Sequence, residues 1–270
     1  MRDRDYFLAA VAIYGCSALY SLFLWRKGFR QDNRINYFLL LAGFILHTAA
    51  MVKRGFSFER CPVNNLYEAM TFVSWTIVCS YLVIGLWSRL RFLGAFSSPI
   101  LFAMGVFTLM PALDVRGPAP QFINGWSSLH AALILLSYGA FGLASIAGLM
   151  YLSQEHDLKF HKLRAIVSLL PSIERLERVM SRLLAGGFFL LTAGLLISPL
   201  LMKQTYGVYF KDDPKIFWSI FVWSLYLGLL LMRWRFAQGG RRFAWGTIAG
   251  FSFVLLTFWG FNLLSRVHNP

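Results

Sequence analysis

The sequence predicts an all-α, polytopic membrane protein with about eight transmembrane helices, and composition and pattern both support this fold class. Of the 270 residues, 57% are apolar and only 14% are charged, and the mean hydropathy is +0.58. A soluble domain is roughly half apolar and a quarter charged. The apolar residues also fall in long unbroken runs, unlike the short alternating segments of a membrane barrel. An ordinary soluble enzyme, a disordered tail and a disulfide scaffold are therefore excluded.

Eight apolar runs approach the roughly 20 residues that a transmembrane helix needs. The runs are Tyr6–Trp25, Ile35–Val52, Tyr67–Trp87, Phe92–Met110, Leu129–Leu152, Leu183–Met202, Ile216–Met232 and Phe243–Leu264. The leader of the first run carries two acids and no clear small-residue cleavage site, so we interpret this run as a span rather than a signal peptide. Without a soluble domain or an obvious internal repeat, residues 1–270 are expected to form a single membrane domain.

Loop charges predict the orientation. The loops after the first, third, fifth and seventh runs hold 16 of the 26 basic residues and five of the 12 acidic ones, a net charge of +11 against +3 on the other side. Lys and Arg concentrate in cytoplasmic loops, so this asymmetry predicts that both termini are external. It also explains the total charge of +14 without nucleic-acid binding.

The longest cytoplasmic loop, 153–182, has an amphipathic pattern. Apolar residues recur at helical spacing from Leu163 to Leu184, and arginines occupy the other face. The pattern predicts an interfacial helix that Pro171 interrupts. We expect this helix to couple parts of the protein rather than to hold a ligand.

The sequence disfavours two classes of membrane protein, dithiol carriers and ion-coupled transporters. The three cysteines, Cys16, Cys61 and Cys79, form no CxxC, which argues against a dithiol carrier. No Asp, Glu or Lys lies at an unambiguous midplane position, which argues against a proton- or ion-coupled transporter.

The five histidines divide into two groups. His156 and His161 lie among charged residues of the long loop and are expected to be solvated. His47, His130 and His268 all fall at or near the outer ends of predicted spans. Imidazole is a good axial ligand for heme iron, which needs ligands on opposite faces of the porphyrin. Any one of these histidines alone would more often be structural, and three at one level strengthen the ligand interpretation without excluding the structural one. His47 is either a third ligand, a donor to a propionate or a packed core residue, and we expect the last.

The outer loops hold side chains that suit a porphyrin. The aromatic ones are Phe56, Phe58, Phe122, Trp126, Tyr206, Tyr209, Phe210 and Trp218, and the basic ones are Lys53, Arg54, Arg60, Arg116, Lys203, Lys211 and Lys215. An aromatic belt and headgroup anchors would explain them equally well. In the polar stretch 211–215, Pro214 is predicted in the first turn of a helix that Asp212 or Asp213 caps.

Four ordered segments resemble a known family. They are 62–68 (PVNNLYE) followed by 72–75 (FVSW), 126–130 (WSSLH) followed by 136–138 (LSY), 206–215 (YGVYFKDDPK) followed by Trp218 and Trp223, and 261–268 (FNLLSRVH). In these segments the sequence resembles the CcsA/ResC family of cytochrome c assembly proteins, part of a heme-handling superfamily that includes CcmC and the HemX-like proteins. The resemblance runs from about residue 35 to the C-terminus.

The resemblance implies an external heme site in a bacterial inner (cytoplasmic) membrane. By resemblance, His130 and His268 are the axial ligands of a non-covalently bound b-type heme, and the loop Tyr206–Trp218 covers it. The cofactor-binding candidates are His130, His268, Tyr209, Phe210, Asp213, Pro214, Trp218, Trp126 and His47. The implied partners are apocytochrome c and a CcsB/ResB-like membrane protein. No catalytic residue is assigned. The protein is expected to orient heme without being an enzyme itself, and the alternative is that it is a component of a holocytochrome c synthase (heme lyase).

The sequence also departs from the family pattern. Tyr206, Phe210 and Asp212 stand where the loop of the family has tryptophans, and Ile216 stands where it has a glutamate. Leu231 occupies the place of a histidine in the seventh span. These changes favour a HemX-like or YpjD-like member, so a non-catalytic regulatory or scaffolding subunit is the alternative function.

Overall fold

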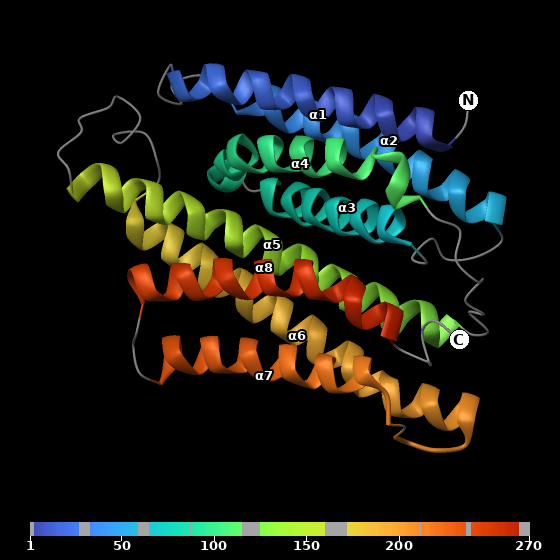
Figure 1. Ribbon diagram of the computed structural model, residues 1–270. Coiled ribbons are helices and arrows are strands. Elements are labelled where there is room, and N and C mark those ends of the chain that lie inside the picture. The colour runs from blue at the N-terminus through green and yellow to red at the C-terminus, as the bar shows by residue number, and fades with distance from the viewer. Residues whose placement is uncertain are drawn as a thin grey trace.

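The computed structural model describes residues 3–26, 33–58, 65–86, 88–114, 125–159, 172–210, 212–235 and 239–264, and these form an all-helical bundle without a strand (Figure 1). The helices are α1 Asp3–Arg26, α2 Arg34–Phe58, α3 Leu66–Gly85, η1 Ser88–Leu93, α4 Gly94–Thr108, η2 Pro111–Leu113, α5 Gly125–Lys159, α6 Ile173–Tyr206, α7 Pro214–Trp234 and α8 Gly240–Leu264. The predicted fold class is confirmed.

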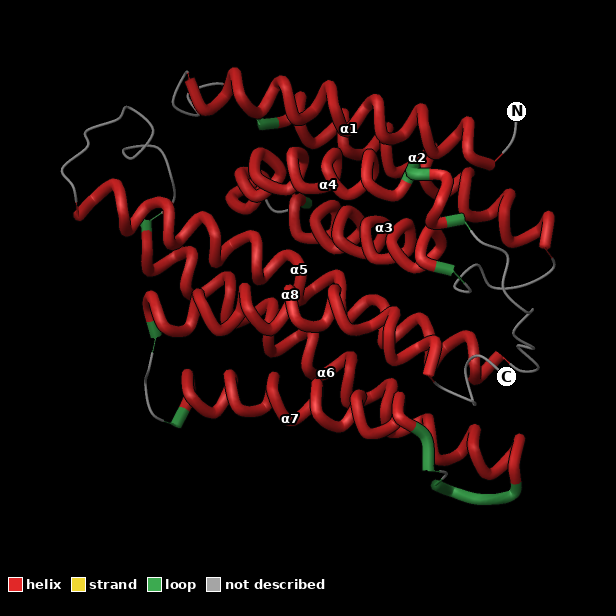
Figure 2. The backbone as a smooth tube through the Cα atoms, viewed as in Figure 1, coloured by secondary structure: helices red, strands yellow, loops and turns green. Residues whose placement is uncertain are grey.

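The long helices alternate in direction, so α1, α3, α5 and α7 begin at the end of the bundle where α8 finishes (Figures 1 and 2). We call the end where α8 finishes the His130 end. We call the opposite end the basic end, because the loops with most of the basic residues follow α1, α3, α5 and α7 there. Seven of the described helices are long and apolar enough to cross a membrane, and α8, with 25 residues, is the eighth long helix. The protein is thus a multi-pass membrane protein, and its predicted orientation stays a prediction.

The largest difference from the predicted spans lies in the segment 153–182. Helix α5 continues to Lys159, and α6 runs without interruption from Ile173 to Tyr206. Residues 173–184 are therefore the first turns of a long helix rather than part of a separate interfacial one. The amphipathic pattern has a packing origin, because Leu176, Met180 and Leu184 are fully buried. Pro171 lies outside the described residues.

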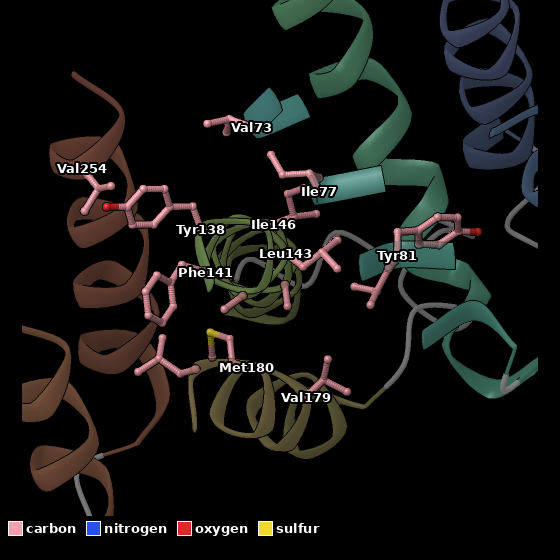
Figure 3. Close-up of a cluster of buried hydrophobic side chains, with 14 of the residues drawn as sticks. Val73, Ile77, Tyr81, Tyr138, Phe141, Leu143, Ile146, Val179, Met180 and Val254 are labelled. Atoms are coloured by element: carbon pink, nitrogen blue, oxygen red, sulfur yellow. The ribbon is translucent and has the colours of Figure 1, made fainter. Parts of the chain in front are cut away.

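Helix α5 is the central helix of the core. It packs against α3, α6 and α8, and its side chains point toward all three in the end-on view of Figure 3. Leu143 and Phe141 are fully buried, and the Phe141 ring stacks on Tyr226 of α7 with 3.6 Å between ring centroids. The α1–α4 half of the chain therefore meets the α5–α8 half mainly along α3 and α5.

Tryptophans connect neighbouring helices by a repeated contact. Three indole N–H groups donate to a threonine hydroxyl 2.9 Å away, in the pairs Trp75–Thr48, Trp218–Thr257 and Trp223–Thr192. Each threonine donates its own hydrogen to the carbonyl of the phenylalanine four residues earlier. Because a bilayer core offers no water to hydrogen-bond, each of these indoles obtains its acceptor from another helix.

The α3–α5 contact requires a glycine. A Cβ atom on Gly139 would lie 2.5 Å from the backbone oxygen of Thr76, which is closer than real Cβ atoms approach. The backbones of the two helices therefore meet directly at this position, as small residues permit in membrane bundles.

We expect Gly139→Ala to separate α3 from α5 and to destabilise the protein by about 1–3 kcal/mol, because the obstacle is backbone that cannot rotate away. Gly228→Ala is the matched control, since a Cβ there would meet nothing within 4 Å. Alanine favours helix by up to ~1 kcal/mol, so the control should be neutral or stabilised. Thermal unfolding in detergent measures both, and equal melting temperatures would contradict the predicted contact.

Candidate functional site at the His130 end

His130 lies in the second turn of α5 with a defined hydrogen bond. Its Nδ1 atom is 2.8 Å from the carbonyl oxygen of Gly194 on α6. A carbonyl oxygen only accepts, so Nδ1 carries the hydrogen, and Nε2 of the neutral ring keeps its lone pair. Metal-ligating histidines generally have this arrangement, in which one nitrogen donates to a carbonyl and the other faces the metal.

The absence of a side chain at Gly194 makes this hydrogen bond possible. A Cβ atom there would lie 2.7 Å from Cδ1 of Ile134, one turn after His130. Since position 194 is a glycine, α5 and α6 approach closely enough for the imidazole to reach a backbone carbonyl. The packing of the two helices thus fixes both the position and the tautomer of the histidine.

The α6–α7 loop presents an exposed apolar surface at the same end. Gly207 ends α6 in the left-handed conformation with φ of 73°. Tyr206, Val208, Tyr209 and Phe210 follow or flank it, with 41–57% of each residue exposed. Lys203 donates to the Tyr209 hydroxyl at 2.5 Å, and its ammonium lies 4.5 Å from the ring centroid. A short ordered loop therefore offers aromatic side chains beside a cation.

Asp213 and Pro214 shape the start of α7. Asp213 is the N-cap, its Oδ1 accepts from the backbone N–H of Lys215 at 2.9 Å, and Pro214 occupies the first turn. The predicted cap is confirmed. Asp213 is only 1% exposed, so its carboxylate is buried against the start of α7. Lys215, two residues after this cap, brings a cation to the same end of the bundle as His130.

The two tryptophan candidates differ in exposure. Trp126 at the start of α5 is 58% exposed. Trp218 is 3% exposed, and its indole N–H donates to Thr257 of α8. The structure therefore places Trp126 on the surface, while Trp218 lies within the bundle between α7 and α8.

The other two candidate histidines are placed differently. His47 is completely buried on α2, with Nδ1 3.2 Å from the Tyr14 hydroxyl and its ring centroid 4.9 Å from that of Phe7. Its Nε2 has no hydrogen-bond partner among the described residues. These contacts describe a packed ring between helices. His268 lies outside the described residues, four positions after the described end of α8.

A buried charge cluster lies at this end and was not predicted. Arg54 donates from Nε to Glu68 at 2.8 Å and from Nη1 to Asp3 at 2.9 Å, and Nη2 lies 2.5 Å from Asp114. The side chains of Arg54 and Glu68 are 7% and 0% exposed. The cluster joins the start of α1, the end of α2, the start of α3 and the segment after α4.

The segment 62–68, which carries part of the family resemblance, supplies the rest of this cluster. Asn65 caps α3 by accepting from the Glu68 N–H, and its Nδ2 donates to Asp114 at 3.0 Å. The Tyr67 ring lies 4.6 Å from the Arg54 guanidinium and 5.6 Å from that of Arg4. Asn65, Tyr67 and Glu68 thus stabilise the bundle. The sequence signal for this cluster is a pair of opposite charges, with Arg54 just after one apolar run and Glu68 at the start of the next.

Comparison with known proteins identifies the family. A model of the cytochrome C assembly protein family matches residues 63–268, from the Asn65–Glu68 segment to the terminal histidine. The chain belongs to this family. Among its curated relatives, the CcsA cytochrome c biogenesis proteins of Gloeobacter violaceus and Guillardia theta are 25% and 27% identical, over 81% and 76% of this chain and 80% and 74% of theirs. The HemX protein of Brevibacillus brevis is 27% identical over 93% of both chains.

Acid should weaken the Arg54 cluster. Burial raises the pKa of Asp114. The hydrogen bond and charge of Arg54, together with Asn65 and Arg4, lower this pKa by more than burial raises it, so it lies below its ordinary value. A carboxyl with a lowered folded-state pKa contributes stability above its unfolded pKa of about 3.9, and this is lost as the pH falls through the folded pKa.

We therefore expect Asp114→Asn to lower the melting temperature at pH 7 and to flatten its decline below about pH 4. Melting temperatures in detergent from pH 7 to pH 2.5 measure this. Asp212→Asn is the control, because Asp212 is exposed. Parallel curves for wild type and Asp114→Asn would contradict the role of Asp114.

We expect Trp218→Phe to lower stability by about 1 kcal/mol, because it removes a buried hydrogen bond and part of a packed ring. The same change at exposed Trp126 should leave stability unchanged. Thermal unfolding of the two variants measures the difference, and equal losses would be inconsistent with the inward position of Trp218.

Proposed function

We propose that this protein binds heme at the His130 end and presents it for attachment to apocytochrome c in a bacterial inner membrane. Nε2 of His130 would be one axial ligand and His268 the other. Family membership supports a role in cytochrome c biogenesis. The observation that carries the proposal for the site is the hydrogen bond from His130 to Gly194, because it supports the tautomer in which Nε2 keeps a lone pair for iron.

Exposed aromatic and basic residues at the His130 end fit a heme. Trp126, Tyr209 and Phe210 supply exposed aromatic surface, and Lys203 and Lys215 supply cations for the propionates. Heme is the cargo in this proposal, and it brings the vinyl groups and the iron. The protein contributes axial ligation and orientation, which increase the effective concentration of the reacting groups.

The partners follow from this role. Attachment requires an apocytochrome c with reduced thiols, and we propose a CcsB/ResB-like membrane protein as a second subunit. Neither requires a catalytic residue of this chain, so we assign none.

A HemX-like regulatory or scaffolding subunit is the second candidate. Leu231, which stands in the place of the seventh-span histidine of the family, is 46% exposed on the surface of α7. A side chain at that position faces outward, so this protein is not expected to hold a second, internal heme there. The similarity to a HemX protein over 93% of both chains supports the same candidate.

The absorption spectrum of the purified protein tests the heme site. We expect wild-type protein, supplied with heme, to show a six-coordinate spectrum that His130→Ala and His268→Ala each change or abolish. His156→Ala is the control, because His156 is exposed at the far end of α5. Melting temperatures confirm that the variants fold.

Unchanged spectra in both variants would overturn the axial assignment. A wild-type protein that takes up no heme would overturn heme binding and leave the scaffolding function as the better account.

A further inference from the structure

A groove opens at the basic end of the bundle, on the opposite side of the membrane from His130. It has a volume of about 260 Å³ and is lined by Arg34, Tyr37, Phe38 and Arg91. The first three come from the start of α2, and Arg91 comes from η1 between α3 and α4. Since a water molecule takes about 30 Å³ of liquid volume, the groove has room for a small headgroup.

Arg91 is held in place before any ligand arrives. Its Nε donates to the carbonyl oxygen of Gly85 at 2.9 Å, and its guanidinium carbon lies 5.3 Å from the centroid of the Tyr37 ring. Tyr37 is fixed in turn, because its hydroxyl donates to the carbonyl of Leu82 at 3.0 Å. The guanidinium therefore has a defined position, and ordering it costs little on binding.

The terminal nitrogens of Arg91 retain donors. In the described parts of the chain, neither Nη atom of Arg91 forms a hydrogen bond or an ion pair with a side chain. A guanidinium presents a planar fork of donors that matches a phosphate, and Arg34 adds a second positive charge to the wall. The groove thus has the chemistry of a phosphate site.

The surroundings select a phosphate attached to a lipid. Arg34 is the first residue of a membrane-spanning helix, so the groove lies where the apolar part of the bundle ends. Phe38 and Ile35, on the first turns of the same helix, are 62% and 51% exposed. An acyl chain would run along such a surface, whereas a free anion would not use it. Basic pockets beside transmembrane helices bind anionic headgroups by this combination.

We propose that the Arg34–Arg91 groove binds the phosphate of an anionic phospholipid, with Arg91 as its main ligand and Phe38 against the acyl chain. The site ties a lipid to α2 and to the α3–α4 connection. It is independent of heme binding at the opposite end.

Native mass spectrometry of the purified protein with added phosphatidylglycerol tests the proposal. We expect a retained lipid adduct in wild type, about ten-fold weaker in Arg91→Gln because a charge-assisted contact is lost. Arg34→Gln should weaken it less. Arg241→Gln is the matched control, since Arg241 is an exposed arginine at the same end, and it should bind as wild type does.

Further measurements separate the outcomes. Phosphatidylcholine should be retained less than phosphatidylglycerol, and inorganic phosphate should not displace the lipid at equal concentration. Displacement of the lipid by inorganic phosphate would mean that the groove binds a small anion rather than a lipid, and would overturn the proposal. Equal retention in wild type and Arg91→Gln would also overturn it. If Arg91→Gln fails to fold, Arg91→Lys is used instead, because it keeps the charge but lacks the planar fork of donors. Unchanged lipid retention in Arg91→Lys would contradict the role of the guanidinium as the main ligand.

Discussion

The constraint on which this structure depends is that polar groups inside a membrane must find partners within the protein. Threonine hydroxyls meet it by donating to the carbonyl four residues earlier, and three of them also accept from a tryptophan on the next helix. A serine–asparagine contact meets it between α1 and α2, where Ser17 donates to Asn36 at 2.5 Å. Because the indole–threonine and serine–asparagine bonds cross from one helix to another, satisfying these polar groups also fixes how the helices pack.

Close helix packing then positions His130, the candidate ligand. Gly139 lets α5 contact the backbone of α3, and Gly194 lets α6 contact α5. The second contact brings a carbonyl oxygen to His130 and leaves its other nitrogen available. A side chain at position 194 would press on Ile134, one turn from His130, and would disturb the candidate site through the helix packing. The site is thus a consequence of the packing of α5.

Hydropathy was sufficient to predict most helices, because each span must present an apolar surface to lipid whatever it packs against. The cap at Asp213 and the helix start at Pro214 were predictable as well, since both depend only on local chemistry. The length of α6 was not, because a buried amphipathic face and an interfacial one have the same periodicity. In a sequence, Leu176 and Met180 do not reveal whether lipid or α5 covers them.

The Arg54 cluster was unpredictable for a different reason. Its partners Asp3 and Asp114 lie 51 and 60 residues away along the chain, and only the antiparallel order of the helices brings them together. The inward position of Trp218 likewise depends on Thr257 of another helix. The α2–α3 and α6–α7 pairs also share a ring contact, Phe44 with Trp75 and Phe188 with Trp223. Such contacts between helices could not be predicted from the sequence, because they do not require a sequence repeat.

Arg54 and Arg91, at opposite ends of the bundle, have different neighbours, and the difference bears on whether an arginine stabilises the fold or can bind a ligand. Arg54 has carboxylates of three chain segments around it, so its charge is neutralised and its loss would leave a buried Glu68 uncompensated. Arg91 is positioned instead by a carbonyl oxygen and an aromatic ring, which orient a guanidinium without neutralising it. A cation that is held in place and keeps its charge is suited to an anion from outside the chain. Rigidity alone therefore does not distinguish a structural arginine from a binding one, whereas the charge of its neighbours does.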